Sequence, residues 1–93
     1  MTPDIEARIA TNFDNAHREE ARDILRRLDE ELREGEHARI LRCVLFLSGG
    51  DMELLVYYSD RASSDWRDVI YWAEYDEQDH RLRDFNQPLP EFS

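Results

Sequence analysis

The sequence contains no lysine, a single cysteine, and only three glycines and three prolines. All 12 basic residues are arginine, against 22 aspartates and glutamates, so the formal net charge is −10. This excess disfavours direct binding to nucleic acid or to an anionic membrane, because phosphate neutralisation needs clustered basic side chains. It favours solubility and suits a basic protein partner. We attribute the exclusive use of arginine to the host, through a GC-rich genome or a salt-rich cytoplasm.

The lone cysteine, Cys43, excludes a disulfide within the chain and predicts a reducing, cytoplasmic location. The first residues lack the basic and apolar regions of a signal peptide, and no apolar run approaches the roughly 18 residues of a membrane span. A chain of 93 residues with 41% hydrophobic content fits one small domain over residues 1–93.

Two helices are predicted in the first third of the chain. Thr-Pro-Asp at its start suits the beginning of a short helix over residues 3–12. Asp14 or Asn15 then caps a longer helix that reaches about Glu34, with Gly35 as its left-handed terminator. The apolar stripe of this longer helix, at spacings of three and four, consists of Ala21, Ile24, Leu25, Leu28 and Leu32.

Residues 37–60 allow two interpretations. As two helices, they are separated by Gly49 or Gly50, and Asp51 caps the second. The first helix has a broad apolar face of Ile40, Leu41, Cys43, Val44, Leu45, Phe46 and Leu47, and the second an inner face of Met52, Leu55, Val56, Ser59 and Ala62.

As strands, the apolar runs on either side of the Gly-Gly pair form a hairpin over residues 39–58. Because clean alternation of polar and apolar residues is absent, we favour helices. The predicted fold is all-α, a single small bundle of four or five helices, with an α+β fold containing this hairpin as the alternative.

The last third begins with a helix from about Asp65 to Tyr75, for which Ser63 or Ser64 is the predicted cap. The acidic, proline-containing tail over residues 77–93 is expected to be extended at its end and mobile. The apolar residues that would dock this tail on the domain are Phe85, Leu89 and Phe92.

Four large rings lie close together in residues 66–75, and on a helix they do not all face one way. One interpretation is a central helix with tyrosines at its rim. The other is an exposed patch for a partner, since Trp, Tyr and Arg dominate interface energies. In that patch Arg67 would stack on Tyr71 or pair with Glu74. The candidate partner-binding residues are Tyr58, Arg67, Tyr71, Trp72 and Tyr75.

Residues 39–76, under half of the chain, resemble a group of small bacterial helical proteins of uncharacterised function. The matching features are the Gly50-Asp51 break, Asp-Trp-Arg-Asp-Val at residues 65–69, and Ala-Glu-Tyr at residues 73–75. The doubled glycine and the long acidic tail depart from that pattern. The resemblance implies a helical fold and carries no activity or catalytic residues.

Reactive constellations are few. Glu34-x-x-His37 and Glu77-x-x-His80 have the spacing of di-metal carboxylate sites, but Gly35 interrupts the first and the second lies in a polar run. Cys43 lies among apolar residues, which predicts an unreactive core thiol. No phosphate loop, nucleophile elbow or zinc spacing occurs. We therefore expect no enzyme, no cofactor and no metal.

Two functions remain as expectations. The first is a small non-catalytic cytoplasmic interaction module with a protein partner or a second copy of itself, that is, a homodimer. The alternative is an acidic inhibitor or nucleic-acid mimic that binds a basic protein. An enzyme or metal protein is a third class, which bound metal on purification would reveal.

Overall fold

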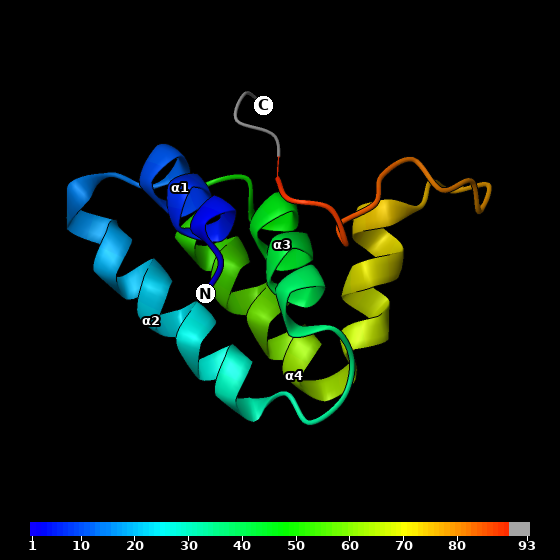
Figure 1. Cartoon of the computed structure of the whole chain (residues 1–93), viewed down its shortest axis with the longest axis horizontal. Coiled ribbons are helices and arrows are strands. Elements are labelled where there is room, and N and C mark those ends of the chain that lie inside the picture. The colour runs from blue at the N-terminus through cyan, green and yellow to red at the C-terminus, as the bar shows by residue number, and fades with distance from the viewer. Residues whose placement is uncertain (90–93) are drawn as a thin grey trace.

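Four helices make up most of the computed structural model, which describes residues 1–89 (Figure 1). They are α1 (Pro3–Asn12), α2 (Asn15–Glu31), α3 (His37–Ser48) and α4 (Met52–Glu74). This described range contains no strand beyond a single bridge between Tyr75 and Arg81. The predicted all-α fold is confirmed, and the hairpin over residues 39–58 is wrong. Of the four helices, none is long and apolar enough to cross a membrane.

The central helix is α3, which packs mainly against α4, while α2 packs on α4 and α1 lies against α2 and α3. Figure 1 shows α3 in front of α4, with α1 and α2 to one side of it. A helix with neighbours on several sides must be apolar around most of its circumference. This explains the nearly continuous apolar run in the middle of the sequence, of which Ile40, Leu41, Cys43, Val44 and Leu45 are buried.

Carboxylates cap two of the helices, as the sequence predicted. Asp14 accepts a hydrogen bond from the backbone N–H of His17 at 3.1 Å and so begins α2. Asp51 accepts from the N–H groups of Glu53 and Leu54, at 2.8 and 3.2 Å, and begins α4. These bonds satisfy donors that the first turn of a helix leaves without partners.

The end of α2 differs from the prediction. The helix ends at Glu31 and not near Glu34, because Leu32 turns extended and buries its side chain. Gly35 does not terminate the helix but lies in the loop that follows, with φ +87. A Cβ at this position would come within 3.2 Å of the Trp66 ring, so the loop passes close over that side chain.

A kink divides α4 and replaces the predicted separate helix. The backbone is helical from Met52 to Glu74 except at Asp65, where φ is −152 and ψ is 96. The cap of the second half is Asp65 itself, which accepts from the N–H of Arg67 at 3.1 Å, and not Ser63 or Ser64. Figure 1 shows the first half passing behind α3 and the second half rising beside it.

Two apolar residues do not face the core as predicted. Val56 is 43% exposed, because the buried positions on this part of α4 are Leu55, Ser59 and Ala62. Phe46 is 37% exposed on α3. Its ring instead packs against Phe85, with centroids 5.3 Å apart.

The segment after α4 turns back across the end of α3 toward α1 (Figure 1). Phe85 and Leu89 are buried there, so both dock the segment as expected. Phe92 and Pro90 lie outside the described residues. The mobility of residues 77–93 stays a prediction.

The α3–α4 turn supplies a matched test of backbone strain. Gly49 and Gly50 have φ of 56 and 85, but only a Cβ at Gly50 would meet an obstacle, the carbonyl oxygen of Asn12 at 2.8 Å. We expect Gly49→Ala to cost about 1 kcal/mol for its left-handed backbone. Gly50→Ala should cost about 1–3 kcal/mol more, because the clash is with backbone. Urea unfolding followed by tryptophan fluorescence measures both; equal losses would contradict the close approach.

Candidate functional site

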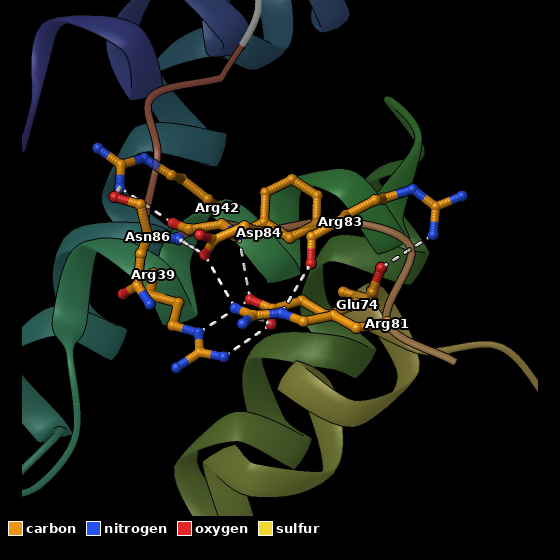
Figure 2. A network of polar contacts seen from close by, with 9 residues as sticks. Arg39, Arg42, Glu74, Arg81, Arg83, Asp84 and Asn86 are labelled. Carbon is orange, nitrogen blue, oxygen red and sulfur yellow. Dashed lines mark hydrogen bonds and ion pairs between the residues drawn. The ribbon is translucent and has the colours of Figure 1, made fainter. Parts of the chain in front are cut away.

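A fully buried carboxylate, that of Glu74, lies at the end of α4. Arg39 of α3 donates to both of its oxygens, from Nη2 to Oε1 at 2.6 Å and from Nε to Oε2 at 2.8 Å. Arg81 donates to Oε1 at 3.0 Å, and the backbone N–H of Phe85 donates to Oε2 at 3.1 Å. Figure 2 shows the two arginines converging on this group from α3 and from the C-terminal segment.

These contacts keep Glu74 ionised. Burial would by itself raise the pKa of its carboxyl, but the hydrogen bonds from Arg39 and Phe85 outweigh it and hold the pKa below the usual value of 4.5. The same pair raises the pKa of Arg39. A paired, fully hydrogen-bonded charge is the form in which a buried carboxylate is tolerated.

A second ion pair, Arg42–Asp4, holds the far end of the C-terminal segment. The guanidinium donates to both Asp4 oxygens, at 2.8 and 3.2 Å. Its Nη1 donates to the carbonyls of Phe85 and Asn86 at 3.0 and 3.4 Å, and Figure 2 shows Arg42 beside Asn86. Asp4 also accepts from the N–H of Leu89 at 3.1 Å. The hydrogen bonds from Arg42 hold the pKa of Asp4 well below its usual range.

The ion pairs of Glu74 with Arg39 and Arg81, and of Asp4 with Arg42, form a network that joins α1, α3, α4 and the C-terminal segment. This network was not predicted from the sequence. One signal was available for Glu74, which follows Ile70 by four residues and therefore shares its buried side of α4. No comparable spacing links Arg39 or Arg42 to acids 35 and 38 positions away. Because both carboxylates are held by guanidinium and backbone donors, the network serves as a clamp.

On the outer side of α4, the kink brings together rings from both halves of the helix. Tyr58 and Trp72 are 14 positions apart, which is about 21 Å along a straight helix. Their ring centroids lie 6.2 Å apart, and the ring of Tyr57 lies 5.1 Å from that of Tyr58. Arg61 lies over Trp72 at 5.9 Å from its centroid and pairs with Asp68 at 2.7 Å.

A second pair of rings lies at the end of α4. Tyr71 and Tyr75 stack with centroids 5.4 Å apart and planes 8° from parallel, and the Tyr71 hydroxyl donates to the carboxylate of Asp79. Tyr57, Tyr71 and Trp72 are 53%, 44% and 43% exposed. The name aromatic face is used below for six residues: Tyr57, Tyr58, Arg61, Tyr71, Trp72 and Tyr75.

The second half of α4 is therefore two-faced. Val69 and Ala73 are fully buried, whereas Tyr71 and Trp72 lie on the exposed side. Trp66 is half-buried against the core. The rings in this stretch do not form one core, and two of them are held out toward solvent.

Of the five candidate partner-binding residues, the four aromatic ones lie on the aromatic face and Arg67 does not. Its guanidinium lies over Trp66 at 5.7 Å and pairs with Asp65 at 3.2 Å, so the predicted contact with Tyr71 or Glu74 is wrong. The kink is the reason, since it makes Asp65 a cap beside Arg67. Arg61 was missed, because only the bent helix brings it to Trp72.

The two Glu-x-x-His motifs do not bring their own members together. His37 Nδ1 lies 2.8 Å from Asp29, and His80 Nδ1 lies 3.5 Å from Asp76, so each histidine faces an aspartate outside its motif. Within residues 1–89, no three side chains of His, Cys, Asp or Glu are grouped as a metal site.

The clamp predicts a loss of stability in acid. Both Glu74 and Asp4 have pKa values below their usual 4.5 and 3.8, so their contribution is complete above those values and is lost as the pH falls toward the folded pKa values. We expect the free energy of unfolding to decline below about pH 4.5. Chemical denaturation at a series of pH values measures this decline.

A charge-removing variant tests the same clamp at neutral pH. Glu74→Gln should cost about 3 kcal/mol, because the partly exposed Arg39 loses its counter-charge and a fully buried acceptor is weakened. It should also reduce the decline in the free energy of unfolding at acid pH. The matched control is Glu20→Gln, an exposed carboxylate of α2, which should change stability by less than about 0.5 kcal/mol. Similar losses in the two variants would contradict a special role for Glu74.

The thiol of Cys43 supplies a probe of unfolding. The side chain is fully buried, and burial, with the nearby charge of Glu74, raises its pKa to about 12. Because the thiolate is the reactive form, we expect modification by a thiol reagent at about pH 8 to follow the unfolding equilibrium. A labelling rate that does not change with urea below the unfolding transition, and equals that of a free thiol, would contradict this.

Similarity to known proteins gives no further guide to this surface. Comparisons with protein-family models, curated proteins and solved structures found no significant match. The resemblance of residues 39–76 to small bacterial helical proteins thus stays a prediction, and the function must be argued from the geometry of the chain itself.

Proposed function

We propose that the protein is a non-catalytic protein–protein interaction module that binds its partner through the aromatic face. The observation that carries the proposal is the exposure of Tyr71 and Trp72, side by side in sequence and each continued by a further ring. Tyr, Trp and Arg are the residues that dominate interface free energies. Leu54 and Val56 add exposed apolar surface on the first half of the same helix.

The aromatic face is preorganised for binding. Tyr58 contacts Trp72, Tyr75 stacks on Tyr71, and Asp79 accepts a hydrogen bond from Tyr71, so these side chains need little further ordering. The clamp at Glu74 fixes the helix that carries them. Ordering of side chains opposes association, and a face that is ordered beforehand avoids much of that cost.

A second candidate function is an acidic inhibitor that binds a basic protein in the cytoplasm. The observation behind it is the composition of residues 52–79, which hold eight carboxylates and two arginines. All of these carboxylates except the buried Glu74 are at least partly exposed, and such a surface steers a basic partner toward it. The interaction module proposed first includes one further case, in which the partner is a second copy of the chain and the aromatic face forms a homodimer.

The test is site-specific photo-crosslinking in the cells that make the protein. A benzophenone amino acid in place of Tyr71 should form a crosslinked protein adduct, because that ring would lie in the interface. The same group in place of Glu20, exposed on α2, is the matched control and should form none. No adduct from either position, with both variants folded, would contradict the proposal.

Light scattering on the purified protein, over ranges of salt and concentration, identifies the partner class. A dimer in the wild type with a folded monomer for Trp72→Ala would mean self-association through this face. If the wild type and Trp72→Ala are both monomers, and position 71 crosslinks to a different protein, the partner is that other protein. Trp72→Ala should itself destabilise the fold by less than the roughly 3–5 kcal/mol of a buried tryptophan, because the ring is half-exposed.

A further inference from the structure

The aromatic face is bordered by a turn that displays negative charge. In residues 76–80, Asp76 closes the turn by accepting from the N–H groups of Gln78 and His80, at 2.8 and 2.9 Å. Glu77 and Asp79 are exposed on the same turn. The link between the turn and the rings is direct, through the hydrogen bond from Tyr71 to Asp79.

Guanidinium groups already occupy this kind of surface within the chain. Arg61 lies over Trp72 while it pairs with Asp68, so one guanidinium is held jointly by a ring and a carboxylate. Arg67 does the same with Trp66 and Asp65. Cation–π attraction and an ion pair act together at both places.

We propose that the aromatic face binds an arginine-rich segment of a partner protein. Guanidinium groups of that segment stack on Tyr71 and Trp72, and Glu77 and Asp79 supply the opposite charge. This inference rests on the proposed function and adds the chemistry of the partner to it. Arginine suits such a site better than lysine, because its planar group stacks on rings and donates to a carboxylate at the same time.

Charge argues against a second copy as the occupant. A two-fold dimer places the same surface on both sides of the interface, so the acidic turn and helix of one copy would face those of the other. The face lies in a stretch with eight carboxylates, of which only Glu74 is buried, and two arginines, in a chain of net charge −10. Like charges brought together oppose association, whereas a basic segment is attracted.

The proposal makes Arg61 an internal competitor. Its guanidinium covers part of Trp72, on which an incoming arginine would stack, and it neutralises Asp68, a further carboxylate next to that site. Removal of this side chain should therefore strengthen binding of a basic segment. A variant that simply damages the surface would weaken binding, so the direction of the change is informative.

The first experiment measures binding of a short, fluorescently labelled arginine-rich peptide to the purified protein by anisotropy at low salt. A peptide with citrulline at every arginine is the control, since it keeps the shape and removes the charge. We expect Trp72→Ala to weaken binding about tenfold, as for an interface residue of large energy. Glu77→Gln with Asp79→Asn should weaken it similarly, and asparagine retains the left-handed backbone of Asp79, whose φ is 63.

Matched variants separate this site from the overall charge. Glu20→Gln with Glu30→Gln removes the same charge from α2, which Figure 1 places across the molecule from the second half of α4, and should change affinity little. Arg61→Gln should tighten binding about threefold more than Arg26→Gln on α2, a change of equal charge. If the variants on α2 changed the affinity as much as the matched variants at the aromatic face and its turn, the proposed site would be wrong, because binding would then follow net charge alone.

The two proposals fail in different ways. If position 71 crosslinks to a second copy, the face is an interface but its occupant is not an arginine-rich segment. The same holds if position 71 crosslinks to another protein while the citrulline peptide binds as well as the arginine peptide. If position 71 gives no adduct and the peptide does not bind, the proposed function falls as well. Tight binding of the arginine peptide that Trp72→Ala weakens supports both.

Discussion

The fold depends on one buried carboxylate with donors from three directions. Glu74 ends α4, and its two oxygens are bound by Arg39 of α3, by Arg81 after the turn, and by the backbone of Phe85. A charge in this position must be fully paired or it destabilises the protein. The requirement fixes the end of α4 against α3 and draws the following segment back over the core.

The backbone of the segment after α4 obtains its hydrogen-bond acceptors from this network, where a helix or a strand would otherwise supply them. Its N–H groups need acceptors, since an unpaired backbone group away from water is unfavourable. The carbonyl of Glu74 accepts from Leu82 and Arg83, its carboxylate accepts from Phe85, and Asp4 accepts from Leu89. Residues 75–89 can therefore cover the core without forming a helix or a strand beyond one bridge.

The helices could be predicted from the sequence because their signals are local. The caps at Asp14 and Asp51 and the apolar spacing of α2 act within a few residues. The kink was the exception: Ser63, Ser64 and Asp65 all suit a cap, and nothing local says that the helical path continues through them. The strand alternative for residues 39–58 was wrong because the apolar run there belongs to a central helix, which is apolar on nearly every side.

The candidate site could be predicted only in part, for the same reason. Tyr71, Trp72 and Tyr75 lie on one helix, so their exposure followed from helical geometry. The contact of Trp72 with Arg61 and the clamp at Glu74 depend on the angle of the kink and on pairs more than 30 positions apart. Charge count alone does not identify such pairs in a chain with 22 acids.

The bond between Asp4 and the N–H of Leu89 has a consequence for synthesis. It joins positions 85 apart, from the first helix to the last described residues. Chains are made from the N-terminus, so α1 leaves the ribosome well before residue 89. Asp4 and Arg42 therefore lack their last hydrogen-bond partners until residues 85–89 have emerged as well.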